Sequence, residues 1–410
     1  AVVLGAGNIA AIPALDVLTE LFVHGATVAL KFNPVNAYLG PFFDHLFGTL
    51  AQGGFVRLVY GGADTGAYLT RHPAVDRIHI TGATRTYDAI VYGTGEDAVA
   101  RKAADDPVIA ASITSELGGV GPTIVVGGRW SEADLEHQAE HLVTQKLHNH
   151  GFNCVACQVL VLPEQWDQAD DLLDAVRAVV PKLAWRGAYY PGVEERRRAA
   201  LSNHPDAEIL TDGDSPVTLI TRLDPTVHDE ACFTTEFFGA VLGVVRLPGA
   251  DSGEYLDNAV AFANERLAGN LGVNLIIHPA TAAQHAAALE SAIEELRYGT
   301  VAVNSWVGVA FAMTRATWGG FPGSPRNDIG SGNGIVHNAL MLEGVERTVV
   351  RGPFAPFPRT LRQGVFHIEP LPPYYVTNPN AAKIGRLASE RAVTGSFAPV
   401  PAMLIAALRA

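Results

Sequence analysis

The stretch Leu147–Cys157 reads LHNHGFNCVAC and places Cys154 just past a glycine turn, at the end of a predicted helix. A thiol used in chemistry reacts as the thiolate, which needs an exposed, electropositive setting. His148, His150 and the backbone amides around Gly151 could supply that setting. The stretch therefore makes Cys154 a candidate nucleophile.

Three other interpretations of these residues stand beside that one. A lone cysteine such as Cys154 is usually a buried small hydrophobe. Cys154 and Cys157 form a CxxC pair, as some redox couples do. His148, His150 and the two cysteines could bind zinc, but their spacing matches no common zinc finger and the sequence has no second CxxC. We therefore expect no metal site.

Composition describes a large, acidic chain with much buried surface. Its 410 residues are too many for one core, so two or more domains are expected. Hydrophobic residues make up 48% and charged residues 17%, which is typical of a globular protein with large sheets. The net charge of -13 argues against nucleic acid or an anionic membrane as a partner, because no basic surplus exists to neutralise phosphates. Three cysteines give no disulfide framework, which favours a cytoplasmic location.

The two ends of the chain carry no targeting or membrane pattern. The first residues, AVVLGAGNIAAIPALDVL, lack the basic region and the cleavage pattern of a signal peptide. The C-terminal PAMLIAALRA is too short to span a bilayer. Because the chain begins directly in an apolar, strand-like run, we expect it to be a fragment that lacks its own beginning.

Residues 1–126 alternate between apolar runs and segments with helical spacing. Such alternation predicts a parallel, doubly wound α/β sheet, in which ligands sit at the carboxyl ends of the strands. The predicted strands are Ala1–Leu4, Thr27–Leu30, Val56–Tyr60, Arg77–Ile80 and Thr123–Val126. The predicted helices are Ile12–Val23, Tyr38–Leu50, Thr65–Thr70 and Thr86–Tyr92, and Gly93–Pro107 is predicted to be a polar surface excursion.

A second α/β unit follows. Ser131, with Asp134 three residues later, is predicted to open the helix that ends at Leu147. After about Gly352, recurring prolines (PFAPFPR, EPLPPYY) predict an irregular arm. Between them, helices are predicted at Trp166–Val180, Ser252–Glu265 and Ala280–Leu296, and strands at Val159–Leu162, Val217–Ile220, Val241–Val245, Val273–Ile277 and Thr300–Val303.

Gly5–Ala10 (GAGNIA) fits GxGxxA after a strand, the pattern of a dinucleotide-binding turn. Two features count against that ordinary function. Pro13 would fall inside the helix that should grip the pyrophosphate, where it removes a backbone hydrogen bond. The next strand ends in Lys31–Pro34 (KFNP), without an acidic residue for the adenosine ribose. The turn is therefore predicted to serve another purpose.

Several stretches, in order along the chain, together resemble the aldehyde dehydrogenase superfamily. Asn8 and Lys31 lie 23 residues apart (31 − 8), as expected of the family's asparagine turn and strand-ending lysine. The matches run from residue 5 to about residue 350. The other matching stretches are Gly61–Gly66 (GGADTG), Ile80–Ala83 against the family's F-T-G-S, Ser115–Gly119 against E-L-G-G, Asn149–Cys154 against N-x-G-x-x-C, Glu236–Gly239 against E-x-F-G, and Arg297–Asn304 with Trp318–Phe321.

The sequence departs from the family pattern at three positions. The F-T-G-S serine is Ala83, so a hydroxyl near the cofactor phosphate is lost, although backbone N–H groups at a helix start can still bind phosphate. Pro34 stands where an acidic residue often follows the lysine, which leaves NADP possible as well as NAD. Ala240 replaces the proline of E-x-F-G-P. The segment that the family places before its first coenzyme-domain strand is absent from this sequence.

The resemblance implies NAD(P)-dependent oxidation of an aldehyde to a carboxylic acid. Cys154 would attack the aldehyde, and Asn8 with the Cys154 N–H would donate to the oxyanion. Glu116 would activate the water that hydrolyses the thioester. Relatives that pass the acyl group to coenzyme A generally lack a glutamate here, so Glu116 favours a free acid as product. The residues implied to hold NAD or NADP are Lys31, Asn33, Gly62, Gly66, Thr81, Gly82, Ala83, Leu117, Glu236 and Phe238.

The same residues also have structural interpretations. Asn8 could cap the following helix, and Phe238 could be core packing. Trp306 could line a substrate tunnel or belong to the core. Cys157 and Cys232 are expected to be structural, while Lys31, Glu116 and Glu236 could be solvent-facing side chains. For the whole chain, the alternatives are an acyl-transferring or reductive relative, a non-catalytic binding or structural member, and a CxxC redox protein.

The resemblance also implies the domain organisation. We expect an α/β fold with a parallel, doubly wound coenzyme domain at residues 1–117, N-terminally incomplete, and an α/β catalytic domain at residues 118–320. Residues 321–410 would hold a return segment, an oligomerisation strand and a proline-rich extension. Glu343–Gly352 (EGVERTVVRG) resembles the family strand that pairs with another subunit, so a homodimer or homotetramer is expected.

Overall fold

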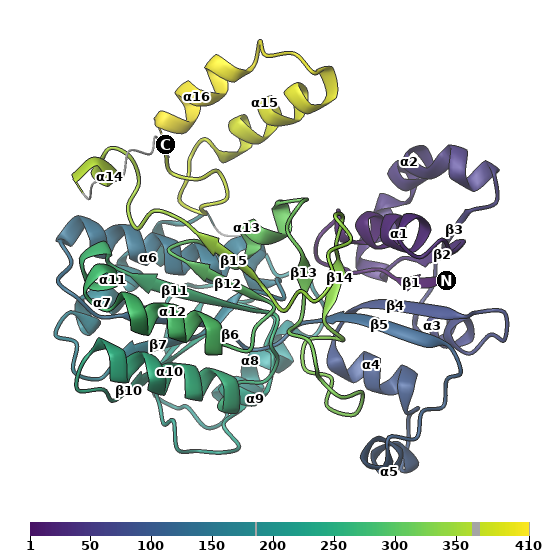
Figure 1. Ribbon diagram of the computed structural model, residues 1–410, viewed down its shortest axis with the longest axis horizontal. Coiled ribbons are helices and arrows are strands. Elements are labelled where there is room, and N and C mark those ends of the chain that lie inside the picture. The colour runs from purple at the N-terminus through teal and green to yellow at the C-terminus, as the bar shows by residue number, and fades with distance from the viewer. Residues whose placement is uncertain (185–186, 363–369, 410) are drawn as a thin grey trace.

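The computed structural model describes residues 1–184, 187–362 and 370–409. The chain forms two α/β lobes that stand side by side, and two helices near the C-terminus lie above the second lobe (Figure 1). The first lobe is built on a five-stranded sheet and the second on an eight-stranded sheet. The predicted α/β class is therefore confirmed.

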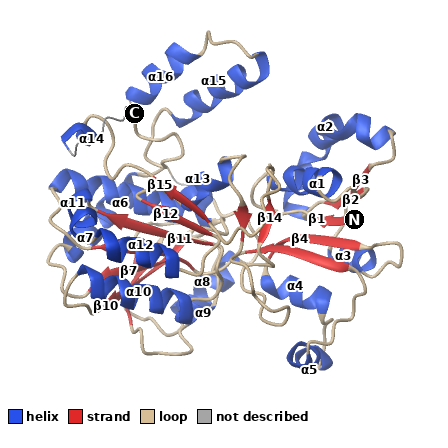
Figure 2. Cartoon of the chain, in the orientation of Figure 1, coloured by secondary structure: helices blue, strands red, loops and turns tan. Residues whose placement is uncertain are grey.

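The first sheet has the strand order β3-β2-β1-β4-β5, and all its neighbouring strands are parallel. This order is that of a doubly wound sheet. Helices α1 and α2 lie on one face of it and α4 on the other (Figure 2). The strands are β1 (Val2–Leu4), β2 (Val28–Lys31), β3 (Val56–Val59), β4 (Arg77–Gly82) and β5 (Ser112–Leu117).

The helices of this lobe follow the predicted alternation. Pro13 lies in the first turn of α1, where a missing N–H costs no intrahelical bond, so the predicted conflict with a helix was wrong. The surface excursion contains α5, which has no buried residue. The segments are α1 (Ile12–Phe22), η1 (Pro34–Leu39), α2 (Gly40–Gln52), α3 (Ala63–Thr70), α4 (Thr84–Val91) and α5 (Asp97–Ala104).

The second sheet has the order β15-β12-β11-β6-β7-β10-β9-β8. Its pairs are parallel, except β8 with β9. Apolar clusters cover both faces, one under α6 and α7 and the other under α10 and α12. The strands are β6 (Gly121–Val126), β7 (Cys157–Pro163), β8 (Glu208–Ile209), β9 (Thr218–Leu223), β10 (Val241–Leu247), β11 (Gly272–Ile277), β12 (Thr300–Val303) and β15 (Thr348–Arg351).

The helices of the second lobe differ from prediction at one clear point. The predicted long helix over residues 280–296 is two helices, because His285 (φ -116°, ψ 35°) leaves the helical region. The segments are α6 (Glu132–Leu147), η2 (His148–Gly151), α7 (Ala169–Val179), η3 (Val180–Lys182), α8 (Val193–Leu201), α9 (Ala231–Thr234), α10 (Ser252–Arg266), α11 (Pro279–Gln284), α12 (Ala286–Glu295) and α13 (Val307–Ala312).

The C-terminal part is more ordered than the proline pattern predicted. A short ribbon of β13 (Trp318–Gly319) and β14 (Ile335–His337) precedes β15, and β15 pairs with β12 of its own chain. Because β15 is the edge strand of the sheet, only one of its sides is paired in this chain, and the predicted pairing with another subunit stays a prediction. Helices α14 (Arg359–Arg362), α15 (Ala381–Thr394) and α16 (Val400–Leu408) replace the predicted irregular arm, although residues 363–369 lie outside the described residues. In the described parts of the chain, no helix is both long and apolar enough to cross a bilayer.

Helix α6, which leads to Cys154, begins with the predicted cap. The Ser131 hydroxyl accepts a hydrogen bond from the Asp134 N–H (3.2 Å), and the Asp134 carboxylate accepts one from the Ser131 N–H (3.1 Å). Ser131→Ala should lower the free energy of unfolding by about 1 kcal/mol, because the cap is lost. Urea unfolding followed by circular dichroism measures it. Ser389→Ala, an exposed residue inside α15, is the matched control, and an equal loss in both variants would contradict the assignment.

Candidate active site

The residues that follow α6 turn the chain sharply toward Cys154. Asn149, His150 and Gly151 are three consecutive residues with positive φ (53°, 55° and 79°). A Cβ on Gly151 would collide with the backbone carbonyl of Gly239, so only glycine fits this close approach. The turn therefore packs the Cys154 loop directly against the Glu236–Gly239 segment.

Asn8 is joined to the same loop from the first lobe. Its side-chain amide donates to the Phe152 carbonyl (3.1 Å), and the Asn149 amide donates to the carbonyls of Asn8 and Phe152 (3.2 Å each). Helix α1 has Ala11 at its N-cap and no side-chain cap, so the alternative that Asn8 caps this helix was wrong. The structure brings Asn8 and the Cys154 loop together across the two lobes.

The Cys154 thiol is half-buried and packs against an apolar cluster that contains Trp306 and Trp318. Burial raises its pKa well above the ordinary value, and the carboxyls of Glu116 and Glu236 raise it further. The backbone N–H groups of Cys154 and Val155 oppose this effect. The predicted electropositive setting was therefore wrong, because the acidic neighbours come from other parts of the fold. The resting group is a protonated thiol.

Glu116 lies near the end of β5 and is 1% exposed. Neither carboxylate oxygen has a hydrogen-bond partner among the described residues, and the Trp318 indole N–H approaches it without reaching hydrogen-bond geometry. Burial raises the pKa of Glu116, while His337, Trp318 and His79 lower it. A buried carboxylate without partners is a strong base, which suits it to activate a water molecule.

Glu236 and Phe238 form the opposite wall of this region. Burial raises the pKa of Glu236 to about 8 against the opposing effects of Arg196 and Lys146, and its buried Oε1 has no partner among the described residues. Phe238 has a positive φ (43°), and its ring lies 5.9 Å from Phe152 and 4.9 Å from Tyr190. Phe238 is half-buried, so it is not a fully buried core residue, which was the alternative interpretation of it.

The predicted cofactor residues gather at the carboxyl edge of the first sheet. Lys31 ends β2, and Gly62 precedes α3 after β3. Gly82 ends β4, and Ala83 stands at the N-cap of α4. The edge is therefore continuous from β2 to β4, which is where ligands bind in doubly wound sheets.

Three of the predicted cofactor side chains are engaged in the fold itself. Asn33 caps η1 by accepting from the Val35 N–H (3.1 Å). The Thr81 hydroxyl donates to Asp16 (3.1 Å), and Leu117 is fully buried in the core of the first lobe. A cofactor would therefore meet Thr81 and Leu117 through their backbones.

The remaining residues fit a dinucleotide. A Cβ at Gly62 or Gly66 would meet open space, so both sit on an uncovered surface beside the start of α3. The Lys31 backbone is paired in the sheet, whereas its side-chain ammonium forms no hydrogen bond with the described residues, and burial lowers its pKa. Together with the unpartnered Oε1 of Glu236, these groups offer donors and acceptors for two riboses and a pyrophosphate.

A cavity of about 730 Å³ opens where the turn after β1, η1 and the Cys154 loop meet. Tyr189 borders it and accepts a hydrogen bond from the Asn149 amide (2.8 Å). No sequence pattern marks Tyr189, because it lies in an irregular loop. The other lining residues are Asn8, Ile9, Ala10, Val35, Asn36, Tyr38, His148 and Asn149.

The other residues singled out from the sequence are mostly structural. Cys157 is buried, and burial raises its pKa to about 11. The three cysteines are free, so the CxxC pair forms no disulfide. Trp306 is 6% exposed and its ring lies 4.8 Å from His148 and 5.7 Å from Tyr374, so it joins the apolar cluster beside Cys154.

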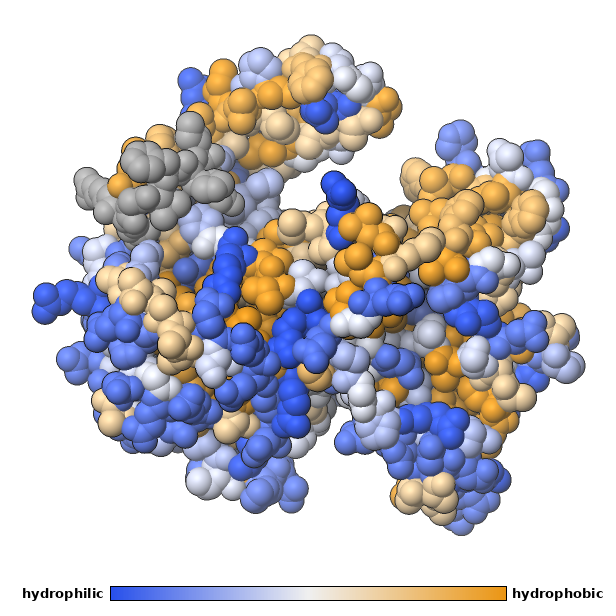
Figure 3. Space-filling view, viewed as in Figure 1, coloured by the Kyte–Doolittle hydropathy of each residue, from blue (hydrophilic) through white to orange (hydrophobic). Residues whose placement is uncertain are grey.

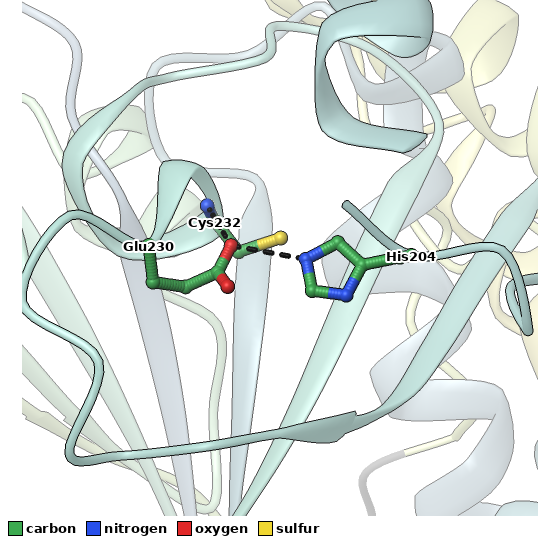
Figure 4. Close-up of side chains that lie close together, drawn as sticks. All are labelled: His204, Glu230 and Cys232. Carbon is green, nitrogen blue, oxygen red and sulfur yellow. Dashed lines mark hydrogen bonds and ion pairs between the residues drawn. The ribbon is translucent and has the colours of Figure 1, made fainter. Parts of the chain in front are cut away.

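A second cluster of polar side chains lies in the second lobe, away from Cys154 along the chain (Figure 4). Glu230 accepts hydrogen bonds from the Cys232 N–H (2.8 Å) and pairs with His204 Nε2 (3.1 Å). The Cys232 thiol is in the apolar core, as expected. These contacts cap α9 and so fix the start of the segment that carries Glu236.

The model of the aldehyde dehydrogenase family matches residues 12–340. This range is more than half of the 410 residues, and it includes the turn after η2, β5 and the Glu236 segment. The chain therefore belongs to the aldehyde dehydrogenase family.

Sequence relatives and solved structures agree with this assignment. The chain is 28% identical over 228 residues to N-succinylglutamate 5-semialdehyde dehydrogenase 1 of Caulobacter vibrioides (50% of this chain, 43% of the relative). It is 33% identical over 172 residues to the NADP-dependent glyceraldehyde-3-phosphate dehydrogenase of Scenedesmus vacuolatus (42% and 65%). The matches thus span 43% and 65% of the length of these two relatives.

Solved structures share the fold at low sequence identity. The gamma-glutamyl-gamma-aminobutyraldehyde dehydrogenase of Burkholderia cenocepacia superposes with a TM-score of 0.62 at 20% identity, over 83% of this chain and 65% of that one. The NAD-dependent aldehyde dehydrogenase of Sinorhizobium meliloti superposes with a TM-score of 0.62 at 22% identity (82% and 62%). The aldehyde dehydrogenase-like fold is therefore confirmed.

The acidic surroundings of Cys154 make a testable prediction. The rate of Cys154 alkylation by iodoacetamide should rise with pH at a midpoint above that of an ordinary thiol. Glu116→Gln should move the midpoint down by about one pH unit, because it removes a neighbouring negative charge. Peptide mass spectrometry at pH 6–10 measures the rate, with Cys154→Ala reporting background labelling of the two buried cysteines. An unchanged or higher midpoint in Glu116→Gln would contradict the described electrostatics.

Proposed function

We propose that the chain is an NAD(P)-dependent aldehyde dehydrogenase that oxidises an aldehyde to a carboxylic acid through an acyl-enzyme on Cys154. The observation that carries the proposal is the convergence of Cys154, Asn8 and the unpartnered buried Glu116 at the meeting of the two lobes. Family membership supports the same reaction. The substrate is an aldehyde whose further identity the site residues do not specify.

Cys154 begins the reaction by attacking the aldehyde carbon. Its thiol must lose a proton as the C–S bond forms, and this proton passes to solvent, which the half-buried thiol reaches. The backbone N–H of Cys154 and the Asn8 amide would donate to the oxygen that becomes negative. Each such donor typically contributes roughly 3–4 kcal/mol to lowering the barrier. In this structure the Asn8 amide donates to Phe152, so it must share or exchange that bond.

The bound cofactor supplies an acceptor for the hydride that leaves the aldehyde carbon, which leaves a thioester on Cys154. Lys31 and Glu236 would hold the two riboses, and Gly62 and Gly66 would let the backbone approach the pyrophosphate. No carboxylate follows Lys31 at Pro34 to repel a 2′-phosphate, so NAD and NADP both remain candidates.

Glu116 completes the reaction by hydrolysing the thioester. It would take a proton from a water molecule as the water oxygen bonds to the acyl carbon, and the C–S bond then breaks to release the acid and the Cys154 thiolate. The free, buried carboxylate is the feature that favours the free acid over transfer to coenzyme A.

The proposal extends to the setting of the enzyme. We place it in the cytoplasm as a homodimer or homotetramer. Strand β15 is at the edge of the second sheet, and an open edge can pair with a second copy. Light scattering after size exclusion would measure the assembly, and a monomer at micromolar concentration would contradict it.

The reaction itself is tested by following NADH and NADPH absorbance with a panel of aliphatic and aromatic aldehydes. Cys154→Ala should abolish activity, while Cys157→Ser should retain it, because only the first thiol lies beside Glu116. Glu116→Gln should give one rapid turnover and then a steady rate lower by roughly 10²–10⁴-fold, because only hydrolysis needs the base.

Other outcomes of this assay would contradict the proposal. Equal activity of the wild type and Cys154→Ala would exclude the covalent mechanism, and loss of activity in Cys157→Ser would favour the CxxC redox alternative. Acyl-coenzyme A as the product, formed only when coenzyme A is added, would favour the acyl-transferring relative. Cofactor binding without turnover of any aldehyde would favour a non-catalytic member.

A further inference from the structure

Three ionisable side chains form a buried cluster next to Glu116 that the reaction described above does not use. Asp16 comes from α1, His79 from β4 and His337 from β14. One carboxylate oxygen of Asp16 lies 2.9 Å from His337 Nε2 and 3.4 Å from His79 Nε2. The other accepts the hydroxyl of Thr81 (3.1 Å). A single carboxylate thus binds two imidazoles from distant parts of the chain.

The register of the first sheet places this cluster beside Glu116. Thr81 on β4 is paired with Glu116 on β5, and His79 is paired with Thr114. Because side chains alternate along strands, these four residues share one face of the sheet. Asp16 and His79 both contact Thr81 on that face. Glu116 itself forms a bridge with Gly332, shortly before β14, which brings His337 to the same place.

Asp16 and the two histidines shift one another's pKa values toward their charged forms, although His337 opposes the protonation of His79. Burial alone would raise the pKa of Asp16, but the two histidines outweigh it and hold that pKa below its ordinary value. Burial alone would lower the pKa of His79 and of His337, but Asp16 outweighs it, and Glu116 adds to the same effect on both. Asp16 and Glu116 thus both favour the imidazolium forms of His79 and His337, and these two histidines and the Trp318 N–H in turn lower the pKa of Glu116.

We propose that the Asp16–His337 pair, backed by His79, is a positioning device that keeps Glu116 ionised in its dry surroundings and so ready to activate water. The proposal rests on the proposed function of Glu116. His337 is the member of the cluster most accessible to solvent, because its side chain is 15% exposed, against 6% for His79 and 0% for Asp16. Its charge, rather than its shape, is what Glu116 requires.

The charge can be separated from the shape by two substitutions. His337→Gln removes the positive charge, whereas His337→Lys restores a positive charge at the same place. The exposed His45 on α2 provides a matched control, His45→Gln. Thermal unfolding of all variants reports whether the fold is kept.

The experiment isolates hydrolysis of the acyl-enzyme from every earlier step. The full chain is acylated with p-nitrophenyl acetate, excess ester is removed, and loss of the acetyl group from the Cys154 peptide is followed by mass spectrometry between pH 5 and 9. In the wild type the rate should rise with pH as Glu116 ionises. His337→Gln should move this rise up by about one pH unit or more, which is a roughly tenfold slower hydrolysis below the midpoint. His337→Lys and His45→Gln should stay close to the wild type.

The alternative outcomes are distinct from one another. Equal shifts in His337→Gln and His337→Lys would show a structural role and overturn the charge proposal, as would no shift in either variant. If the wild type is not acylated on Cys154, or if Glu116→Gln hydrolyses its acyl group at the wild-type rate, the proposed function fails and the inference falls with it.

Discussion

The hydrogen bonds between Asn8, Asn149 and the Phe152 carbonyl are the interaction on which the site depends. Asn8 belongs to the turn after the first strand of one lobe, and Asn149 belongs to a left-handed turn at the end of the longest helix of the other. Through these bonds the end of a five-stranded sheet and the end of α6 share one loop. The position of Cys154 follows from that junction, and the contact between Gly151 and Gly239 adds the Glu236 segment to it.

Two opposing effects on the pKa values of the acids and of the thiol meet inside this junction. Burial raises the pKa of Glu116, Glu236 and Cys154, and each acid raises that of the thiol. The opposing charges sit one layer behind, in the histidines bound to Asp16 and in Lys146, whose pKa burial lowers to about 8. The space beside the Cys154 thiol is thus buried and lined by two carboxyls, and the basic side chains that oppose them lie behind the carboxyls. The surface of the first lobe differs from this buried site, because it exposes apolar side chains of α1 and α2, including Phe22, Phe42 and Leu46. Figure 3 shows apolar surface over this lobe.

The sequence was informative where the signal is local. Long apolar runs predicted the buried strands, and the Ser131 cap and the glycine turn before Cys154 were read from a few neighbouring residues. Strand β5 was missed because its residues, SITSEL, mix polar and apolar side chains. The structure gives the reason for two of the polar ones: Thr114 and Glu116 face the buried cluster at α1. The C-terminal helices were not predicted, because the recurring prolines after Gly352 indicated an irregular arm. Helix α15 (Ala381–Thr394) itself contains no proline.

The electrostatic environment of the candidate site was harder to predict from the sequence than the residues that form it. The histidines near Cys154 in sequence suggested a positive setting, whereas the groups near it in space are carboxyls from residues 116 and 236. The Asp16–His337 pair joins residues 321 positions apart, and no local pattern marks either one. Local spacing therefore singled out the proposed nucleophile, while only the tertiary structure determines the charge around it.

The central claim, an acyl-enzyme on Cys154 that Glu116 hydrolyses, is tested most directly by peptide mass spectrometry. Glu116→Gln would be mixed with NAD or NADP and an aldehyde, quenched in acid after a few seconds, and digested. The account predicts a mass increase equal to the acyl group on the peptide that carries Cys154, together with one equivalent of reduced cofactor. Reduced cofactor without any covalent mass, or an acyl group on another residue, would contradict it.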